Sequence, residues 1–427
     1  MSSAEYQRRW RASKGARTGH PGRPATQPCG TVAAFQRHKR AGEEPCEACR
    51  QAEKERQAAA YKKRTGAGSP AAAEFFAGIG LVRMALESAG IAVVWANDIE
   101  PIKARLYEQN FGAGHYILGD VREVNGPDLP DVQLATASFP CTDLSLAGWR
   151  RGLAGEHSSM FWEFARVLAE MEERRPPVIL LENVPGFATS HGGEDLRAAI
   201  EHLNDLGYVC DVIQMDAARF VPQSRPRLFI IGSERRTQRR PEEVDALRPQ
   251  RLIDFALAHP QLDLQAVEVE VPPVVPSSLP EVVERLSPQN KLWWDADRTS
   301  AFLASLSPLQ SARLEAMAAG RSLSWRTAYR RTRHGVATWE IRADEIAGCL
   351  RTARGGSSKQ AVVEAGRGRV RVRWMTAREY ARLQGAPDSF NFGRASANQV
   401  MFGFGDAVCV PVVAWIAQNY LKPLLTR

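Results

Sequence analysis

Between residues 71 and 184, short apolar runs alternate with amphipathic helical stretches, and each run ends in a turn that carries a reactive or ligand-binding residue type. Buried strands joined by helices form βαβ units, whose parallel strands bring their carboxyl ends to one edge of the sheet. We therefore predict an α/β fold with a doubly wound, mostly parallel sheet and a ligand-binding rim along that edge. The residues at the five turns are, in order, Gly78 with Gly80, Asp98, Asp120, Cys141 and Glu182.

Three of these turns suggest chemistry by residue type alone. Gly78 and Gly80 allow a ligand to approach the backbone at the start of a helix. Asp98 ends the run 91–96, where a carboxylate can accept hydrogen bonds from ribose hydroxyls. Cys141 follows Pro140 just after the run 132–137, so it is either a nucleophile or a small apolar filler, and the turn alone leaves both open.

Positive charge is concentrated at the N-terminus. The formal net charge is +8, and residues 1–66 hold 15 Lys or Arg against 6 Asp or Glu. A basic arm favours a polyanion such as nucleic acid as partner, with a solvated basic tail as the alternative. The sequence has 44% hydrophobic residues, no uninterrupted apolar run of membrane-spanning length and no N-terminal signal core, so we expect a cytoplasmic protein that does not bind a membrane.

The basic arm also contains four residues of metal-ligand type within 21 positions, namely Cys29, His38, Cys46 and Cys49. The Cys-x-x-Cys pair has the spacing of a zinc knuckle, and two further soft ligands would complete a tetrahedral structural site. A short segment with little apolar core needs such a staple to fold. We predict a structural Zn²⁺ here, with unligated thiols in an unfolded tail as the alternative.

Composition divides the chain into five parts. We predict an N-terminal arm over 1–66, a linker over 67–71, a catalytic domain over 72–234, a smaller irregular target-recognition domain inserted over 235–374, and a return to the catalytic domain with a C-terminal helix over 375–427. Residues 321–378 hold 14 Lys or Arg against 4 Asp or Glu, interleaved with aromatic residues, a pattern typical of groove contact. The loop near residue 355 is the expected DNA-facing element, through Arg351, Arg354, Ser357 and Lys359.

The ordered motifs resemble those of the DNA (cytosine-5)-methyltransferase family. The turn 76–80 (Phe-Ala-Gly-Ile-Gly) resembles its cofactor motif, Pro140-Cys141 its nucleophile turn, and Glu182-Asn183-Val184 its acid motif. Further on, 223–227 (Gln-Ser-Arg-Pro-Arg), 378–387 and 399–410 resemble its later motifs. The resemblance covers residues 74 to about 415 and leaves the first 70 residues uncovered.

The resemblance implies a role for each matching residue. Cys141 would add as a thiolate to carbon 6 of a cytosine flipped out of double-stranded DNA, because carbon 5 becomes nucleophilic only after that addition. A protonated Glu182 would donate to ring nitrogen 3, while Arg225 and Arg227 would lower the thiol pKa and hold the base or its phosphate. S-adenosyl-L-methionine would be held at its methionine side by Phe76, Gly78 and Gly80, at its ribose by Asp98, at its adenine by Ile99 and Asp120, and further by Pro140, Asp406 and Val408.

One departure from the family pattern concerns the cofactor directly. The family has Gly-Asn where this chain has Gly405-Asp406, and the additional carboxylate would face that of the cofactor. We nevertheless expect an active methyltransferase of bacterial or phage origin that works as a monomer, with a restriction endonuclease as its possible companion. The alternatives are an RNA cytosine-5 methyltransferase and a non-catalytic DNA-binding relative.

Overall fold

The computed structural model describes residues 28–41, 43, 45–53, 55–56, 69–140, 160–235, 239–275, 277–333, 336–351 and 359–426. The chain separates into two compact units, Met1–Arg56 and Gln57–Arg427. The first unit contains helix α2 (Val32–Ala41) and a second helical stretch that begins at residue 47. Ala34, Phe35 and Cys49 form its small buried cluster.

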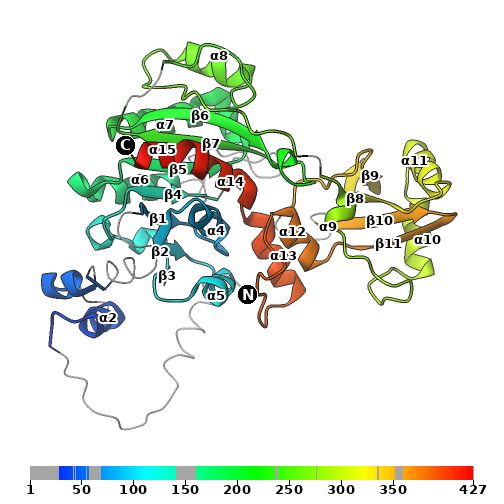
Figure 1. Cartoon of the computed structure of the whole chain (residues 1–427), viewed down its shortest axis with the longest axis horizontal. Helices are drawn as coiled ribbons and strands as arrows, with labels where there is room; N and C mark the ends of the chain where they lie inside the picture. Colours follow the sequence, from blue (N-terminus) through cyan, green and yellow to red (C-terminus); the bar gives the residue numbers. More distant parts are fainter. Residues whose placement is uncertain are drawn as a thin grey trace, which may run out of the picture. The chain divides into compact units, whose positions relative to one another are not determined.

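The second unit is built on a seven-stranded sheet with the strand order β3-β2-β1-β4-β5-β7-β6 (Figure 1). All neighbouring strands are parallel except β7, which runs antiparallel to both β5 and β6. The doubly wound, mostly parallel sheet predicted from the alternating runs is thereby confirmed. The strands are β1 (Ala71–Phe75), β2 (Ala92–Asp98), β3 (Tyr116–Leu118), β4 (Leu134–Ala137), β5 (Val178–Asn183), β6 (Val209–Asp216) and β7 (Pro226–Ser233).

Successive side chains of each strand point to opposite faces of the sheet, so both faces carry apolar side chains. Helices cover both of these faces. In β5, Val178 and Leu180 join the core that includes α4 and α14, whereas Ile179 and Leu181 join the core that includes α6 and α7. Burial of both faces explains why these strands are continuously apolar. The covering helices are α4 (Leu81–Ser88), α5 (Pro101–Phe111), α6 (Met160–Glu170), α7 (Glu194–Asp205) and α14 (Val410–Ile416), and α8 (Gln250–Ala258) follows the last strands.

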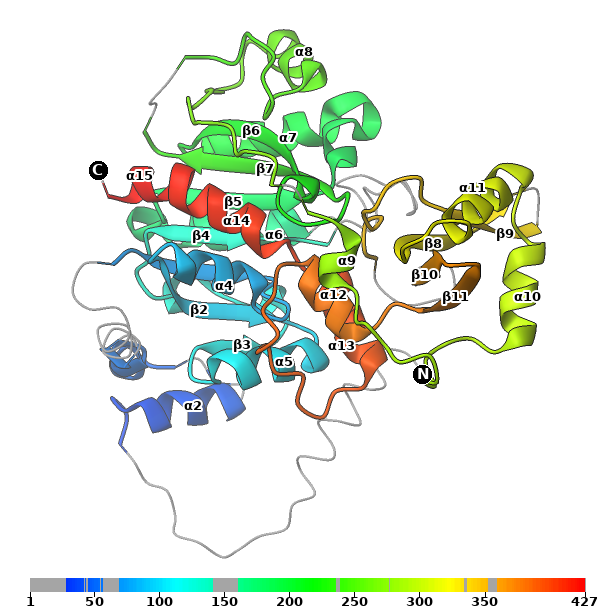
Figure 2. The ribbon, with the colours of Figure 1, turned by 45° about the vertical axis from the view of Figure 1, so that its right-hand side comes forward.

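The insertion forms a second, four-stranded antiparallel sheet in the order β11-β10-β8-β9, to one side of the large sheet (Figure 2). It is more regular than the sequence suggested. The alternation Arg-Val-Arg-Val-Arg-Trp over 369–374 has the period of a strand. The basic and aromatic composition of the segment around it led us to predict an irregular domain instead. Its elements are α9 (Leu279–Val282), α10 (Ala296–Ala304), α11 (Pro308–Ala318), β8 (Ser324–Arg333), β9 (Val336–Ile341), β10 (Gln360–Gly366) and β11 (Arg369–Trp374).

After β11 the chain returns to the large sheet through α12 (Ala377–Leu383), α13 (Ala397–Asp406), α14 and α15 (Lys422–Leu425). Helix α14 packs against α4, beside the first strand. Among the described residues, the stretch Ala397–Leu425 is long and apolar enough to cross a membrane by composition, but 67% of its most apolar window is buried in the protein. This burial identifies it as a core element.

Candidate active site

The turn after β1 has an unusual backbone and is held by the end of β2. Phe76, Gly78 and Gly80 all adopt positive φ angles, of 55°, 56° and 86°. The Gly78 amide donates to Asp98 Oδ2 at 2.8 Å, and the Glu100 amide donates to Asp98 Oδ1 at 2.8 Å. A Cβ on Gly78 would meet nothing closer than 3.9 Å, so the turn borders open space on that side. The glycine turn and the Asp98 carboxylate therefore lie together, an arrangement that a nucleotide-type ligand requires.

A carboxyl group is buried under this turn. Glu74, on β1, is fully buried, and burial raises its pKa to about 8 despite the nearby Arg83 guanidinium. Its Oε1 accepts from the Arg83 amide at 3.4 Å, while Oε2 has no hydrogen-bond partner among the described residues. Glu74 therefore keeps its proton in the folded state at a pH where the unfolded chain has lost it.

This burial predicts a pH dependence of stability. Since the folded pKa is raised above the ordinary value of 4.5, the contribution of Glu74 is fully present below pH 4.5 and is lost as the pH rises through about 8. We expect Glu74→Gln to remove that loss, so that its urea midpoint improves relative to the wild type between pH 5 and 9. A difference between the two midpoints that does not change with pH would contradict the expectation.

The ends of β2 and β3 present apolar side chains to solvent at the same edge. Ile99 is 42% exposed and Leu118 is 36% exposed, in contrast to the buried residues that precede Ile99 in β2. Asp120 lies just after β3, where its carboxylate is bound by the Arg122 side chain at 2.6 Å and caps a short helix through the Arg122 amide. This pairing holds the pKa of Asp120 below its usual range. An exposed apolar edge beside an acceptor suits an adenine ring.

The predicted acid and one predicted arginine meet at the end of β5. Glu182 Oε1 lies 2.8 Å from Arg227 Nε, and the two side chains are 11% and 15% exposed. They share a face because β5 and β7 are antiparallel neighbours in which Leu180 and Phe229 belong to the same core. The sequence predicted both residues as catalytic, and the sheet register brings them into contact.

Arg225 has a different environment from Arg227. It is 3% exposed, and its guanidinium donates to the carbonyl oxygens of Leu350 at 2.9 Å and Ala407 at 2.7 Å. Gln223 and Gln384, both fully buried, connect the same segments through further hydrogen bonds to main-chain atoms. We call Gln223, Arg225 and Gln384 the buried knot. It joins the segment before β7 to Leu350, between β9 and β10 of the insertion, and to the segments after α12 and α13.

The sequence analysis gave no role to two residues at this edge, Cys349 and Asn183. The Cys349 thiol lies 3.3 Å from Arg225 Nη1 and 3.9 Å from Arg227 Nη2. Burial acts to raise the pKa of this thiol, but the two guanidinium groups outweigh it and bring the pKa below its ordinary value. Asn183 Nδ2 donates to the Phe139 carbonyl at 3.4 Å and so connects the acid motif to the strand end at the exposed Pro140. The predicted nucleophile, Cys141, lies outside the described residues.

The segment after α12 forms an ion pair with helix α5. Asp406, the residue that departs from the family pattern, forms an ion pair with Lys103 on α5, with its Oδ2 2.9 Å from Nζ. Val408 is 4% exposed and packs in the core on the α4 side of the sheet. No sequence signal linked Lys103 to Asp406, because the two residues are 303 positions apart.

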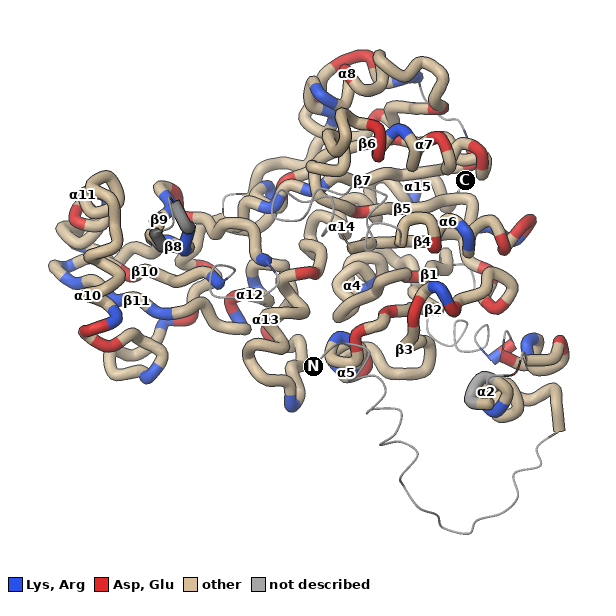
Figure 3. Tube along the Cα trace, turned by 180° about the vertical axis from the view of Figure 1, so that it is seen from behind, with Lys and Arg blue, Asp and Glu red and all other residues tan. Residues whose placement is uncertain are grey.

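Two of the four predicted DNA contacts fall in the described part of the insertion. Arg351 is exposed, and Lys359 Nζ donates to Asn398 Oδ1 at 2.7 Å. Arg354 and Ser357 lie outside the described residues. Lys and Arg recur on the strands of the small sheet, with Asp and Glu among them (Figure 3). The DNA contacts of Arg351 and Lys359 stay predictions.

The aromatic residues of the insertion pack mainly on one another. The rings of Trp294, Trp339 and Trp374 lie 5.3–5.6 Å apart in a cluster against the core of the small sheet. Trp325 is likewise largely buried, with 9% of its surface exposed.

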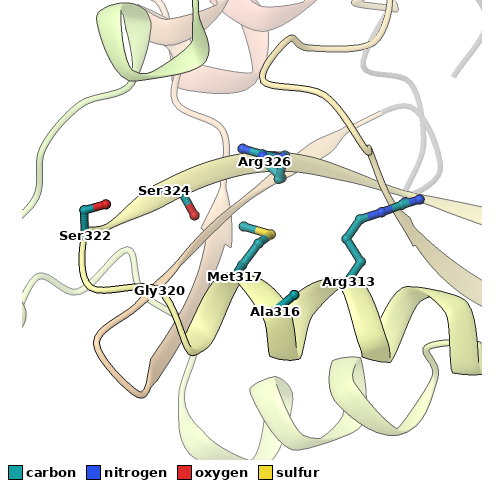
Figure 4. A pocket seen from close by; sticks show the side chains of 7 residues that line it. All are labelled: Arg313, Ala316, Met317, Gly320, Ser322, Ser324 and Arg326. Atoms are coloured by element: carbon teal, nitrogen blue, oxygen red, sulfur yellow. The ribbon is translucent and has the colours of Figure 1, made fainter.

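A shallow depression of about 380 Å³ lies between α11 and β8 (Figure 4) and contains none of the predicted site residues. Its lining is Arg313, Ala316, Met317, Gly320, Ser322, Ser324 and Arg326.

In the N-terminal unit, the four predicted metal ligands converge. One ligand atom from each of Cys29, His38, Cys46 and Cys49 lies within 4.8 Å of all the others. Cys29 Sγ is 3.5 Å from His38 Nε2, and the other ring nitrogen of His38 lies 2.9 Å from Glu43 Oε2. A carboxylate that orients a ligating histidine is a usual second partner in zinc sites.

Comparisons with known proteins place this geometry in a family. Residues 71–422 match the family described as C-5 cytosine-specific DNA methylase. The Type II methyltransferase M.BsuFI of Bacillus subtilis is 34% identical over 160 residues, which are 37% of this chain and 38% of that protein. The Type II methyltransferase M.NlaX of Neisseria lactamica is 28% identical over 349 residues, 81% of this chain and 94% of that protein.

A solved structure shows the same fold. The crystal structure of the S. pombe Dnmt2 methyltransferase aligns with a TM-score of 0.54 and 19% identity, covering 83% of this chain and 99% of that one. Because the family match spans most of its length, the chain belongs to the C-5 cytosine-specific DNA methylase family, whose reaction is methyl transfer to carbon 5 of cytosine in DNA.

Proposed function

We propose that this chain methylates cytosine in double-stranded DNA through a covalent adduct of Cys141 at carbon 6 of a flipped-out base. The observation that supports it best is the contact between Glu182 and Arg227, at a strand end that Asn183 connects to the residues just before Cys141. A base inside a duplex cannot contact these groups, so the reaction requires base flipping.

The residues divide the reaction between them. Addition of the Cys141 thiolate to carbon 6 moves electron density to carbon 5 and to ring nitrogen 3, and a protonated Glu182 donates its proton toward nitrogen 3, where negative charge develops. Arg227 fixes the position of Glu182. S-adenosyl-L-methionine, when bound, supplies the methyl group to carbon 5. Loss of the carbon 5 proton to a base then allows the thiolate to leave, which restores the aromatic ring and the enzyme.

The residues at the sheet edge fit that cofactor. The open side of the 76–80 turn would take the methionine part, Asp98 the ribose, and Ile99 with Asp120 the adenine, while Pro140, Asp406 and Val408 border the same site. The exposed apolar side chains at the ends of β2 and β3 support this assignment, because they lie where a ring would cover them.

Trapping on DNA that contains 5-fluorocytosine tests the proposal. Fluorine cannot leave carbon 5 as a cation, so the wild type with cofactor should form an adduct that survives denaturing electrophoresis. Cys141→Ser should form none, and Cys349→Ser, which changes the thiol beside Arg225 and Arg227, should still trap. An adduct that persists in Cys141→Ser, or none in the wild type, would rule out the proposed mechanism. The RNA alternative is tested by offering unmodified duplex RNA as the methyl acceptor. Methylation of the RNA in preference to DNA would favour that alternative.

We further propose that the N-terminal unit binds one structural Zn²⁺ through Cys29, His38, Cys46 and Cys49. Their mutual approach within 4.8 Å matches the closed tetrahedral set of thiolate and imidazole ligands that zinc prefers. The Glu43 carboxylate would orient the His38 ring.

The Type II relatives support a role beside a restriction endonuclease. We also propose that the protein acts on DNA inside the cell as a monomer.

Zinc content can be measured directly on the full chain. We expect the wild type to release about one Zn²⁺ per chain when its thiols are modified with a mercurial. Cys49→Ser should hold far less zinc, because a structural site loses its closed geometry when any one of its ligands is removed. Cys349→Ser is the matched control and should keep its zinc. Equal zinc contents in Cys49→Ser and the wild type would show that the four residues do not bind the metal.

A further inference from the structure

Lys103 is a largely buried cation at the edge where the cofactor is proposed to bind. It lies in the first turn of α5, and its side chain is 13% exposed. Its ammonium group is 2.9 Å from Asp406 Oδ2 and 5.3 Å from the centre of the Phe402 ring. Asp98 and Glu100 act on the same ammonium group electrostatically, and these carboxylates together raise the pKa of Lys103 in spite of its burial. The lysine therefore carries its charge among three carboxylates.

The ion pair lies next to the glycine turn. Asp98 also binds the Gly78 amide, so the carboxylate that holds the turn faces Lys103 as well. On the other side, α13 packs on the turn itself, because a Cβ on Gly403 would lie 2.7 Å from a side-chain carbon of Ile79. Asp406 ends this same helix. The Asp406 carboxylate is thereby positioned at the methionine side of the proposed cofactor site.

We propose, on the basis of the function proposed above, that Lys103 is a positioning residue of the cofactor site, whose ammonium group neutralises Asp406 and so allows a carboxylate ligand to bind beside it. Without Lys103, the carboxylate of the methionine part would approach Asp406 in a partly buried site, where like charges repel strongly. With the ion pair in place, the adjacent ammonium group offsets the charge of Asp406 and so reduces its repulsion of a second carboxylate. Lys103 and Asp406 thus form one functional unit.

A set of four full-length variants tests this unit. They are Lys103→Met, Asp406→Asn, the double variant Lys103→Met/Asp406→Asn, and Arg105→Met as a control that removes an exposed positive charge from the same helix. Calorimetry would measure binding of two probes. S-adenosylhomocysteine carries the methionine-type carboxylate, and 5′-methylthioadenosine has the same adenosine and sulfur without it.

We expect Lys103→Met to weaken binding of S-adenosylhomocysteine at least about tenfold, because it removes the positive charge 2.9 Å from the Asp406 carboxylate. The double variant should bind within about threefold of the wild type, and Arg105→Met should match the wild type. Binding of 5′-methylthioadenosine should change less than about threefold in every variant, since it has no carboxylate to repel.

The outcomes separate this inference from the proposed function. If the wild type binds neither probe, the proposed cofactor site itself is wrong. If the wild type binds S-adenosylhomocysteine and the double variant binds it more than about tenfold more weakly, Lys103 does not act through Asp406 and the inference is overturned. The double variant removes both charges together, so this criterion holds even where Lys103→Met alone does not fold.

Discussion

Methyl transfer is expected to fall at least about a hundredfold in kcat when Arg227 is replaced by methionine, while binding of S-adenosylhomocysteine stays close to that of the wild type. Arg227 contacts Glu182 at the end of β5, so its loss leaves the Glu182 carboxyl without the group that positions it. Single-turnover methylation of a duplex with a tritiated methyl group would measure the chemical step separately from product release.

The control for that experiment is Arg227→Lys, which keeps the charge but cannot reproduce the planar contact of a guanidinium with a carboxylate. We expect it to recover part of the lost rate. If Arg227→Met methylates DNA as fast as the wild type, Arg227 does not position the acid, and the proposed role of the Glu182–Arg227 contact is wrong.

A second large effect is expected at Arg225, and it concerns stability. Arg225→Met would remove two buried hydrogen bonds from a charged donor, to the carbonyl oxygens of Leu350 and Ala407, and leave Ala407 with only its bond from Gln384, at a cost of about 1.5–3 kcal/mol for each lost bond. The urea midpoint should therefore fall well below that of the wild type. Arg251→Met, at an exposed position on α8, should leave the midpoint almost unchanged.

The comparison between the two arginines is itself informative. The sequence pattern predicted the same catalytic role for both, since they alternate in one motif. If Arg225→Met lost activity with an unchanged midpoint, the buried knot would contribute little to stability and Arg225 would act in catalysis instead. If both variants lost stability equally, the distinction drawn from their environments would fail.

The sequence was informative where local pattern and burial coincide. The apolar runs and their turns predicted the parallel sheet and the group Gly78, Asp98 and Glu182 at its edge, because strand alternation determines which side chains share a face. It could not predict contacts between distant segments. The ion pair of Lys103 and Asp406 and the hydrogen bonds of Arg225 depend on how the C-terminal segment packs, and no local property of residues 103 or 225 encodes that.

The insertion is a second example of a structure that the sequence pattern did not predict. Its strands carry so many arginines that the pattern indicated a surface for DNA rather than a sheet. Trp339 and Trp374 belong to the basic and aromatic pattern that indicated groove contact, but they pack against Trp294 in the core of the small sheet. Aromatic residues serve both purposes, and only the three-dimensional packing distinguishes them.

The segment 347–350 has a consequence for engineering new target specificity. Although it belongs to the insertion in sequence, Ala347 exchanges main-chain hydrogen bonds with Pro222 and Ser224, and Leu350 is bound by the buried knot. A recognition module grafted from a relative would therefore keep its host stable only if these four residues came from the host. The practical boundaries for module exchange therefore lie inside the small domain, on either side of this segment between β9 and β10, rather than where the chain leaves the large sheet after β7.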